Sequence, residues 1–246
     1  MITNNTGKSE LLDKLTYLLH LYKSGKLGGT SHEVYPNLEK GSTENYLYFT
    51  LASSINFQRK SEGLWQSALS TYQDPETSFV FNPTQVMSVS EDAVRRALIK
   101  HNLALLPEKH TYIWATLCNT FYKYYCGTPK KLLEDCSYDV VKVIKLLQSK
   151  KKWFPYLSGP KLSNYWLYIL SHFTDVKLKS KEEISIIPDL HVIRATYHLG
   201  LVSSETVKPE HVAQVWKEFL SGTELAPSDL HAPLWRWSRR GFKPEL

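Results

Sequence analysis

Leucines three and four residues apart mark the first predicted helix of this chain, and the same spacing of apolar residues returns along most of the sequence. In residues 9–25, Leu11 and Leu15 share one face, while Ser9 is placed to cap the helix and Gly25 to end it. This pattern constrains the fold strongly, because an amphipathic helix must bury its apolar stripe against other elements.

Capping residues accompany several of the other periodic stretches. Ser42 or Thr43, Ser61 and Ser90 stand at expected helix starts, Asp189 is placed as an N-cap, and Gly200 as a C-terminal stop. Residues 77–90 contain the one run with the pattern of an extended segment, which ends at Asn82-Pro83. We therefore expect an all-α fold of about ten helices, the later ones in residues 42–58, 61–72, 90–103, 110–125, 137–149, 161–173, 188–201, 208–222 and 231–242.

Length, charge and cysteine content narrow the class of protein. The 246 residues suit one large domain or two lobes, and the net charge of +6 favours an anionic partner such as nucleic acid, nucleotide or anionic lipid. The three cysteines lack the spacing of a zinc or iron–sulfur site, and an odd number argues against a disulfide framework. With no signal peptide and no bilayer-spanning apolar run, we expect a soluble intracellular protein.

A lysine stands where a helix is expected to begin. In "LSGPKLSNYW", residues 157–166, a Ser-Gly-Pro turn precedes Lys161, although the positive end of a helix dipole disfavours a cation. A hairpin of this kind exposes N–H groups that bind an anion such as phosphate. Desolvation by Tyr165 or Trp166 favours the neutral amine, a nucleophile that forms Schiff bases. The alternative is a plain helix connection with a solvated lysine.

Asp189 is the second candidate for chemistry. Pro188 makes the approach to the helix rigid, and Asp189 then stands at the N-cap position. A carboxylate held by helix N–H groups is suited to stabilise a developing cation or to orient a nucleophile. The capping role and the catalytic role are compatible.

Together the two segments resemble the helix-hairpin-helix (HhH-GPD) DNA glycosylase superfamily, and most closely its archaeal 8-oxoguanine DNA glycosylase branch. Gly159 and Lys161 match the hairpin of the superfamily, and Pro160 stands where a glycine is usual. The Val-Asp-x-His-Val-x-Arg…Leu-Gly-Leu segment of the superfamily is matched by Asp189, His191, Val192, Arg194, Leu199, Gly200 and Leu201. The resemblance covers about residues 45–240.

The resemblance implies a two-lobed helical fold of the HhH-GPD type, with the active site in the cleft between the lobes. One lobe is expected over residues 30–175, with the helix-hairpin-helix motif at about 140–172. The second lobe is expected from residues 1–29 and 176–246, and it carries Asp189.

The resemblance also assigns roles to single residues. Lys161 is the expected nucleophile and Asp189 its carboxylate partner, while Tyr168 stands where the branch has a second lysine. The residues expected to line the base pocket are Trp65, Trp235, Pro188, His231 and Asp229, with His231 at a position where the branch has an aspartate. Gln58 falls in the segment with which the superfamily inserts a wedge into the gap in the duplex, so it is the expected wedge residue. The other expected DNA contacts are Ser158, Gly159, Lys150, Lys151 and Lys152.

These matches imply a DNA repair enzyme with both glycosylase and lyase activity. Its expected substrate is double-stranded DNA holding an oxidised purine such as 8-oxoguanine, which it flips out and excises through a lysine Schiff base. No cofactor or metal is expected, and the protein is expected to be a monomer in the cytoplasm or nucleoid, or in a eukaryotic nucleus. Two alternatives stay open: a queuosine-salvage-like nucleosidase on a related scaffold, and a non-catalytic DNA-binding relative.

Overall fold

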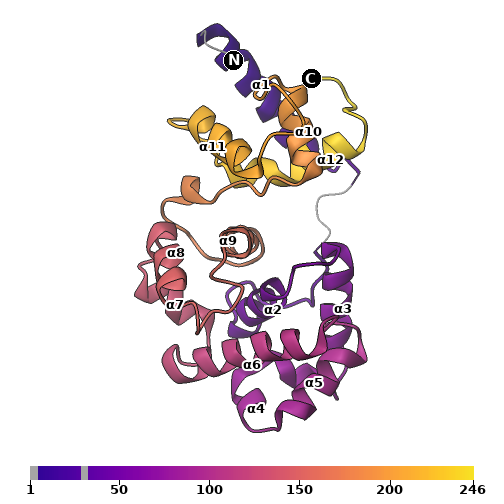
Figure 1. Cartoon of the computed structure of the whole chain (residues 1–246), viewed down its shortest axis with the longest axis vertical. Helices are drawn as coiled ribbons and strands as arrows, with labels where there is room; N and C mark the ends of the chain where they lie inside the picture. Colours follow the sequence, from indigo (N-terminus) through magenta and orange to yellow (C-terminus); the bar gives the residue numbers. More distant parts are fainter. Residues whose placement is uncertain (1–4, 29–32) are drawn as a thin grey trace. The chain divides into compact units, whose positions relative to one another are not determined.

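The computed structural model describes residues 5–28 and 33–246, and the regular secondary structure of these residues is helical (Figure 1). Within these ranges there are twelve α-helices, three short 3-10 helices and no β-strand; a single isolated bridge pairs Asp139 with Lys179. The expected all-α class is therefore confirmed. Over the same ranges, no helix combines the length and the apolar character needed to span a membrane.

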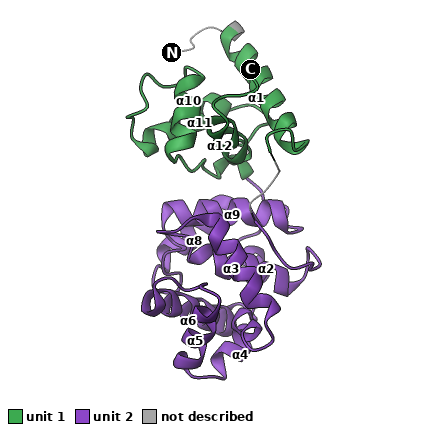
Figure 2. Cartoon of the chain, turned by 90° about the vertical axis from the view of Figure 1, so that its right-hand side faces the viewer, with its two compact units in different colours: residues 1–31, 181–246 green, residues 32–180 purple. Residues whose placement is uncertain are grey.

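The chain forms two compact units, which Figure 2 distinguishes by colour. Unit 1 comprises residues 1–31 and 181–246, and unit 2 comprises residues 32–180. The boundaries expected from the sequence, after residues 29 and 175, fall a few residues earlier. Lys161 belongs to unit 2 and Asp189 to unit 1.

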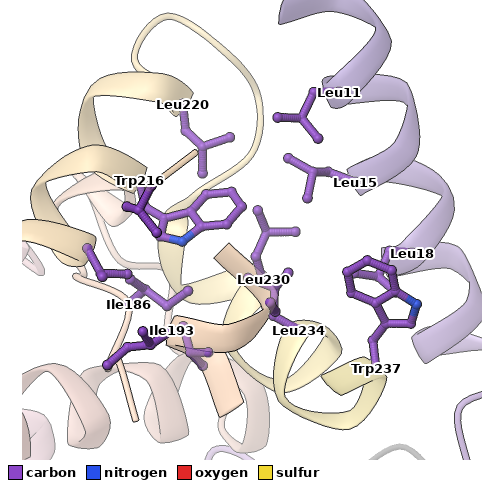
Figure 3. Close-up of a cluster of buried hydrophobic side chains, with 14 of the residues drawn as sticks. Leu11, Leu15, Leu18, Ile186, Ile193, Trp216, Leu220, Leu230, Leu234 and Trp237 are labelled. Atoms are coloured by element: carbon purple, nitrogen blue, oxygen red, sulfur yellow. The ribbon is translucent and has the colours of Figure 1, made fainter. Parts of the chain in front are cut away.

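Unit 1 joins two distant stretches of sequence through a shared apolar core. Leu11, Leu15 and Leu18 face this core from the first helix (Figure 3). Trp216 and Trp237 are the largest side chains buried in it, with at most 1 % of their surface exposed. The elements of this unit are α1 (Asn5–Lys23), η2 (Lys181–Glu183), α10 (Leu190–His198), α11 (Pro209–Leu220), η3 (Pro227–Leu230) and α12 (His231–Arg239).

Unit 2 is built around one helix that is buried on all sides. Every residue from Asn45 to Ser54 in α2 is buried, as expected of a helix that other helices surround. Helices α9, α7 and α6 pack against it. The elements of this unit are α2 (Thr43–Ser54), α3 (Ser61–Gln73), η1 (Ser78–Phe81), α4 (Pro83–Met87), α5 (Glu91–Lys100), α6 (Pro107–Tyr124), α7 (Pro129–Asp135), α8 (Val140–Ser149) and α9 (Pro160–Phe173).

Several predicted helix ends are confirmed by their hydrogen bonds. The Ser42 and Ser90 hydroxyls accept N–H groups of the first turns of α2 and α5. Gly25 and Gly200 follow α1 and α10 with positive φ angles of 74° and 73°, a conformation that glycine adopts readily. The prediction for Ser9 was wrong, because Ser9 lies inside α1, which begins at Asn5. The polar residues 5–8 contain no proline and continue the helix toward its N-terminus.

The prediction of an extended run within residues 77–90 was also wrong. Its apolar residues form η1, and Asn82 accepts the N–H groups of Thr84 and Gln85 to begin α4. The Thr77 hydroxyl donates 2.7 Å to the Thr71 carbonyl and turns the chain back on α3. Short β-branched and aromatic runs do not distinguish a strand from a buried helical turn.

Candidate functional site

Lys161 follows the connector between α8 and α9, at about the place that the sequence indicated. Helix α8 ends at Ser149 and α9 begins at Pro160, so residues 150–159 join them. Tight turns shape the end of this connector, where the Gly159 N–H donates 2.9 Å to the Tyr156 carbonyl. A Cβ at Gly159 would lie only 3.1 Å from that oxygen, so a side chain fits poorly there.

Helix α9 begins without a side-chain cap, because its N-cap residue is Gly159 and its first residue is Pro160. The N–H groups of its first turn are thus available to an anion. Lys161 is exposed at this end. The expectation that Tyr165 or Trp166 desolvates the amine was wrong, because both rings turn into the core of unit 2. The nucleophilic role of Lys161 stays a prediction.

Hydrogen bonds hold those two rings in the core. The Trp166 indole N–H donates 2.9 Å to the Thr50 hydroxyl on α2. The Tyr165 hydroxyl accepts the indole N–H of Trp65 at 3.0 Å and lies 3.5 Å from the Glu33 carboxylate. Burial, together with the negative charge of Glu33, raises the pKa of Tyr165 well above its usual value.

Trp65 does not form a pocket wall in this structure. Its side chain is fully buried, and its ring packs beside Tyr48 and Phe49 with centroid distances of 5.9 and 5.5 Å. Because the indole N–H is bound to Tyr165 and no ring face is exposed, no base can stack on it here. The interpretation of Trp65 as a base platform is therefore corrected to that of a core residue.

Asp189 is the N-cap of α10, as predicted. Its Oδ1 accepts the N–H groups of His191 and Val192, each at 3.0 Å, and its side chain is half-buried. No hydrogen bond to Oδ2 is found within the described residues. The carboxylate is thus held by the helix through one oxygen, which leaves the other available to a ligand.

Trp235 lies on the neighbouring helix, against the start of α10. The His191 ring meets the Trp235 ring edge-to-face at 5.5 Å, and its Nδ1 lies 3.4 Å from the Ser238 hydroxyl. The guanidinium of Arg239 lies 4.7 Å from the Trp235 ring centroid, over one of its faces. Trp235 is half-buried, so among the two tryptophans only this one keeps accessible ring surface.

Asp229 is engaged by the protein itself. One carboxylate oxygen accepts the Lys181 ammonium at 2.6 Å, and the other accepts the Ala226 N–H at 3.3 Å. These bonds fix the turn before α12, which is a structural role. Pro188 and His231 are half-buried in the same unit, and their roles in a base pocket stay predictions.

The residues predicted to bind DNA in unit 2 lie on or near the connector. Lys151 and Lys152 are exposed, while the Lys150 ammonium lies 4.1 Å from the centroid of the Trp153 ring. Ser158 and Gly159 are half-buried at the turn. Gln58 is exposed at the tip of the loop between α2 and α3, with a φ angle of +53°.

The sequence reasoning missed a group of residues that joins this loop to the connector. Phe57 and Tyr156 stack with ring centroids 4.3 Å apart and planes 12° apart. His110 meets Phe57 edge-on at 5.0 Å, and Arg59 donates 2.6 Å to the Leu103 carbonyl. The only local signal for this group in the sequence was Phe57 directly before the polar residues 58–61.

Two hollows lie in unit 1, away from Asp189. One of about 500 Å³ is bounded by α1, His198 and the C-terminal residues. Another of about 460 Å³ lies between η2 and the segment from Leu220 to Asp229.

No group of three or more metal-ligating side chains occurs in the described ranges. No family model and no curated protein matches the chain.

Proposed function

We propose that the chain is a DNA glycosylase with lyase activity that removes an oxidised purine, such as 8-oxoguanine, from duplex DNA. The main support is the exposed lysine on an uncapped helix start that directly follows a hairpin. Backbone N–H groups at this position favour a phosphate, and Lys161 then lies beside a bound nucleotide. The net charge of +6 agrees with an anionic partner.

The proposed reaction begins when the neutral Lys161 amine attacks C1′ of the flipped nucleotide. The glycosidic C1′–N9 bond breaks, and the base leaves with the bonding electrons and takes up a proton. Loss of the amine proton and opening of the sugar ring give a protonated imine. Removal of a C2′ proton then expels the 3′ phosphate, and water hydrolyses the imine to free the lysine.

Asp189 supplies the negative charge in this proposal. The free Oδ2 is the oxygen that would face the cation developing at C1′, while Oδ1 stays bound to the helix. The reaction requires Lys161 and Asp189 to act on the same nucleotide. A double-mutant cycle on base release tests that requirement, because independent residues give additive losses.

Borohydride trapping tests the proposal directly. Wild-type protein incubated with an 8-oxoguanine duplex and borohydride is expected to give a covalent protein–DNA adduct, because the reductant traps the imine. Lys161→Gln should give no adduct, whereas Lys145→Gln, which removes an exposed lysine of α8, should trap as wild type does. Asp189→Asn keeps the helix cap but removes the negative charge. It should therefore slow base release by about 10²–10⁴-fold.

Two other outcomes would overturn the proposal. Release of the base without any trapped adduct would favour the nucleosidase-like alternative, in which water attacks the sugar. Salt-sensitive DNA binding with neither release nor trapping would indicate a non-catalytic DNA-binding protein.

A further inference from the structure

The loop between α2 and α3 is fixed to the hairpin connector by stacked rings. The Phe57 ring stacks on the Tyr156 ring, with centroids 4.3 Å apart. The fully buried His110 ring meets the Phe57 ring edge-to-face, with centroids 5.0 Å apart. The Lys109 ammonium lies 5.8 Å from the Tyr156 centroid. Three separate parts of unit 2 therefore meet at one aromatic group.

On the other side of Gln58, hydrogen bonds hold Arg59 in place. Arg59 donates 2.6 Å to the Leu103 carbonyl and 3.4 Å to the Asn102 carbonyl, and burial lowers the pKa of its guanidinium. The loop residue between Phe57 and Arg59 is thus anchored on both sides, while its own side chain points to solvent.

Backbone conformation shows that this arrangement has an energetic cost. Gln58 and Tyr156 have φ angles of +53° and +61°, which residues other than glycine seldom adopt. Strain of this kind persists only where surrounding contacts hold it, and it is common at functional positions. Here the Phe57–Tyr156 stack and the Arg59 hydrogen bonds supply those contacts.

We propose that the Phe57–Tyr156 stack is a positioning device that holds Gln58 beside the phosphate-binding hairpin. Gln58 then enters the duplex at a fixed distance from the nucleotide that the hairpin binds. This inference rests on the proposed function. A nucleotide that leaves the stack opens a gap, and a preordered side chain fills this gap with less loss of conformational entropy than a mobile one. The exposed lysines Lys60 and Lys109 give this edge a charge that suits a phosphate backbone.

A fluorescent duplex tests the positioning role. The probe carries 2-aminopurine opposite a tetrahydrofuran abasic site, and its fluorescence rises when a side chain unstacks the aminopurine. With the full chain, Phe57→Ala and Tyr156→Ala should each lower the equilibrium for unstacking by roughly three- to tenfold, the factor expected for one lost aromatic pair. The double variant should lose no more than either single one, because both remove the same stack.

Three controls keep the result specific. Tyr156→Phe retains the ring and should behave as wild type does. Tyr122→Ala removes a similarly exposed tyrosine from α6 and should change nothing. DNA affinity measured by fluorescence anisotropy should change little in the alanine variants, because the hairpin still binds phosphate. Tyr156 is 43 % exposed, so its substitution is compatible with folding even if that of Phe57 is not.

The outcomes separate this inference from the function on which it rests. Normal trapping together with wild-type unstacking in Tyr156→Ala would overturn the positioning role alone. Additive losses in the double variant would also overturn it, because they would mean that the two rings act separately. Failure of the wild-type protein to bind the duplex or to trap would overturn the proposed function, and the positioning role with it.

Discussion

Acid should destabilise this protein through one buried histidine. His110 on α6 has no exposed surface, and neither of its ring nitrogens has a hydrogen-bond partner within the described residues. Burial, followed by the positive charges of Arg59 and Lys109, lowers the pKa of His110 from 6.5 to about 4. The perturbation we consider is His110→Leu, which removes the titrating ring and keeps an apolar side chain of similar size.

The magnitude follows from the two protonation equilibria. The unfolded chain takes up a proton near pH 6.5, whereas the folded protein takes it up only near pH 4. Between these values the unfolded state binds more protons, so the free energy of unfolding decreases as the pH falls. The decrease from this histidine is about 2 kcal/mol between pH 7 and pH 5, and about 3 kcal/mol by pH 4.

Urea unfolding between pH 7 and pH 4 measures this effect. Wild type should lose about 2 kcal/mol more than His110→Leu between pH 7 and pH 5. At pH 7 the variant should be at least as stable as wild type, because it no longer buries an unpaired N–H, which costs about 1–3 kcal/mol. Hydrogen exchange of the α6 amides assigns the change to unit 2.

The control is His211→Gln, which removes an exposed histidine of α11 and should leave the pH dependence unchanged. Identical pH dependence in wild type and His110→Leu would refute the reasoning. It would mean that the folded protein protonates the His110 ring without penalty, through a water or a local opening that satisfies the charge.

Three further predictions concern single side chains. Asp189→Ala should lower the stability of unit 1 by about 1 kcal/mol through loss of the α10 cap, whereas Asp189→Asn should lose much less; equal losses in urea unfolding would contradict the capping role. The Lys100 ammonium and the His101 ring lower the pKa of Asp74, so its contribution to stability is complete above about pH 4 and decreases as the pH falls toward the lowered pKa; the difference in melting temperature between wild type and Asp74→Asn should therefore shrink as the pH falls below about 4. Trp65→Ala should cost about 3–5 kcal/mol as a core truncation; a fully stable variant that only loses base release would restore Trp65 as a base platform.

Helix ends were the part of the fold that the sequence predicted best. Asp189 and Ser90 cap helices through local hydrogen bonds, and Gly200 ends one through its own conformation, so each signal lies within a few residues of its effect. Residues 77–81 were misjudged because Thr77 bonds back to α3 and turns the chain there. That contact is absent from any local pattern.

Side-chain orientation in the candidate site was harder to predict. Trp65 and Tyr165 are 100 residues apart in sequence, and the bond between them decides that both rings face the core. The same bond takes Tyr165 away from Lys161, although the two residues lie one helical turn apart. Tertiary partners therefore decided which aromatic residues could line a site.

The interleaved order of the two units has a consequence for synthesis on the ribosome. The leucine face of α1 leaves the ribosome before unit 2, but its partners Trp216 and Trp237 leave it only after unit 2. Unit 2 is continuous in sequence, so it can complete its core before the partners of α1 have been synthesised. A nascent chain arrested before α11 would therefore expose an unpaired apolar helix, a ready target for chaperones.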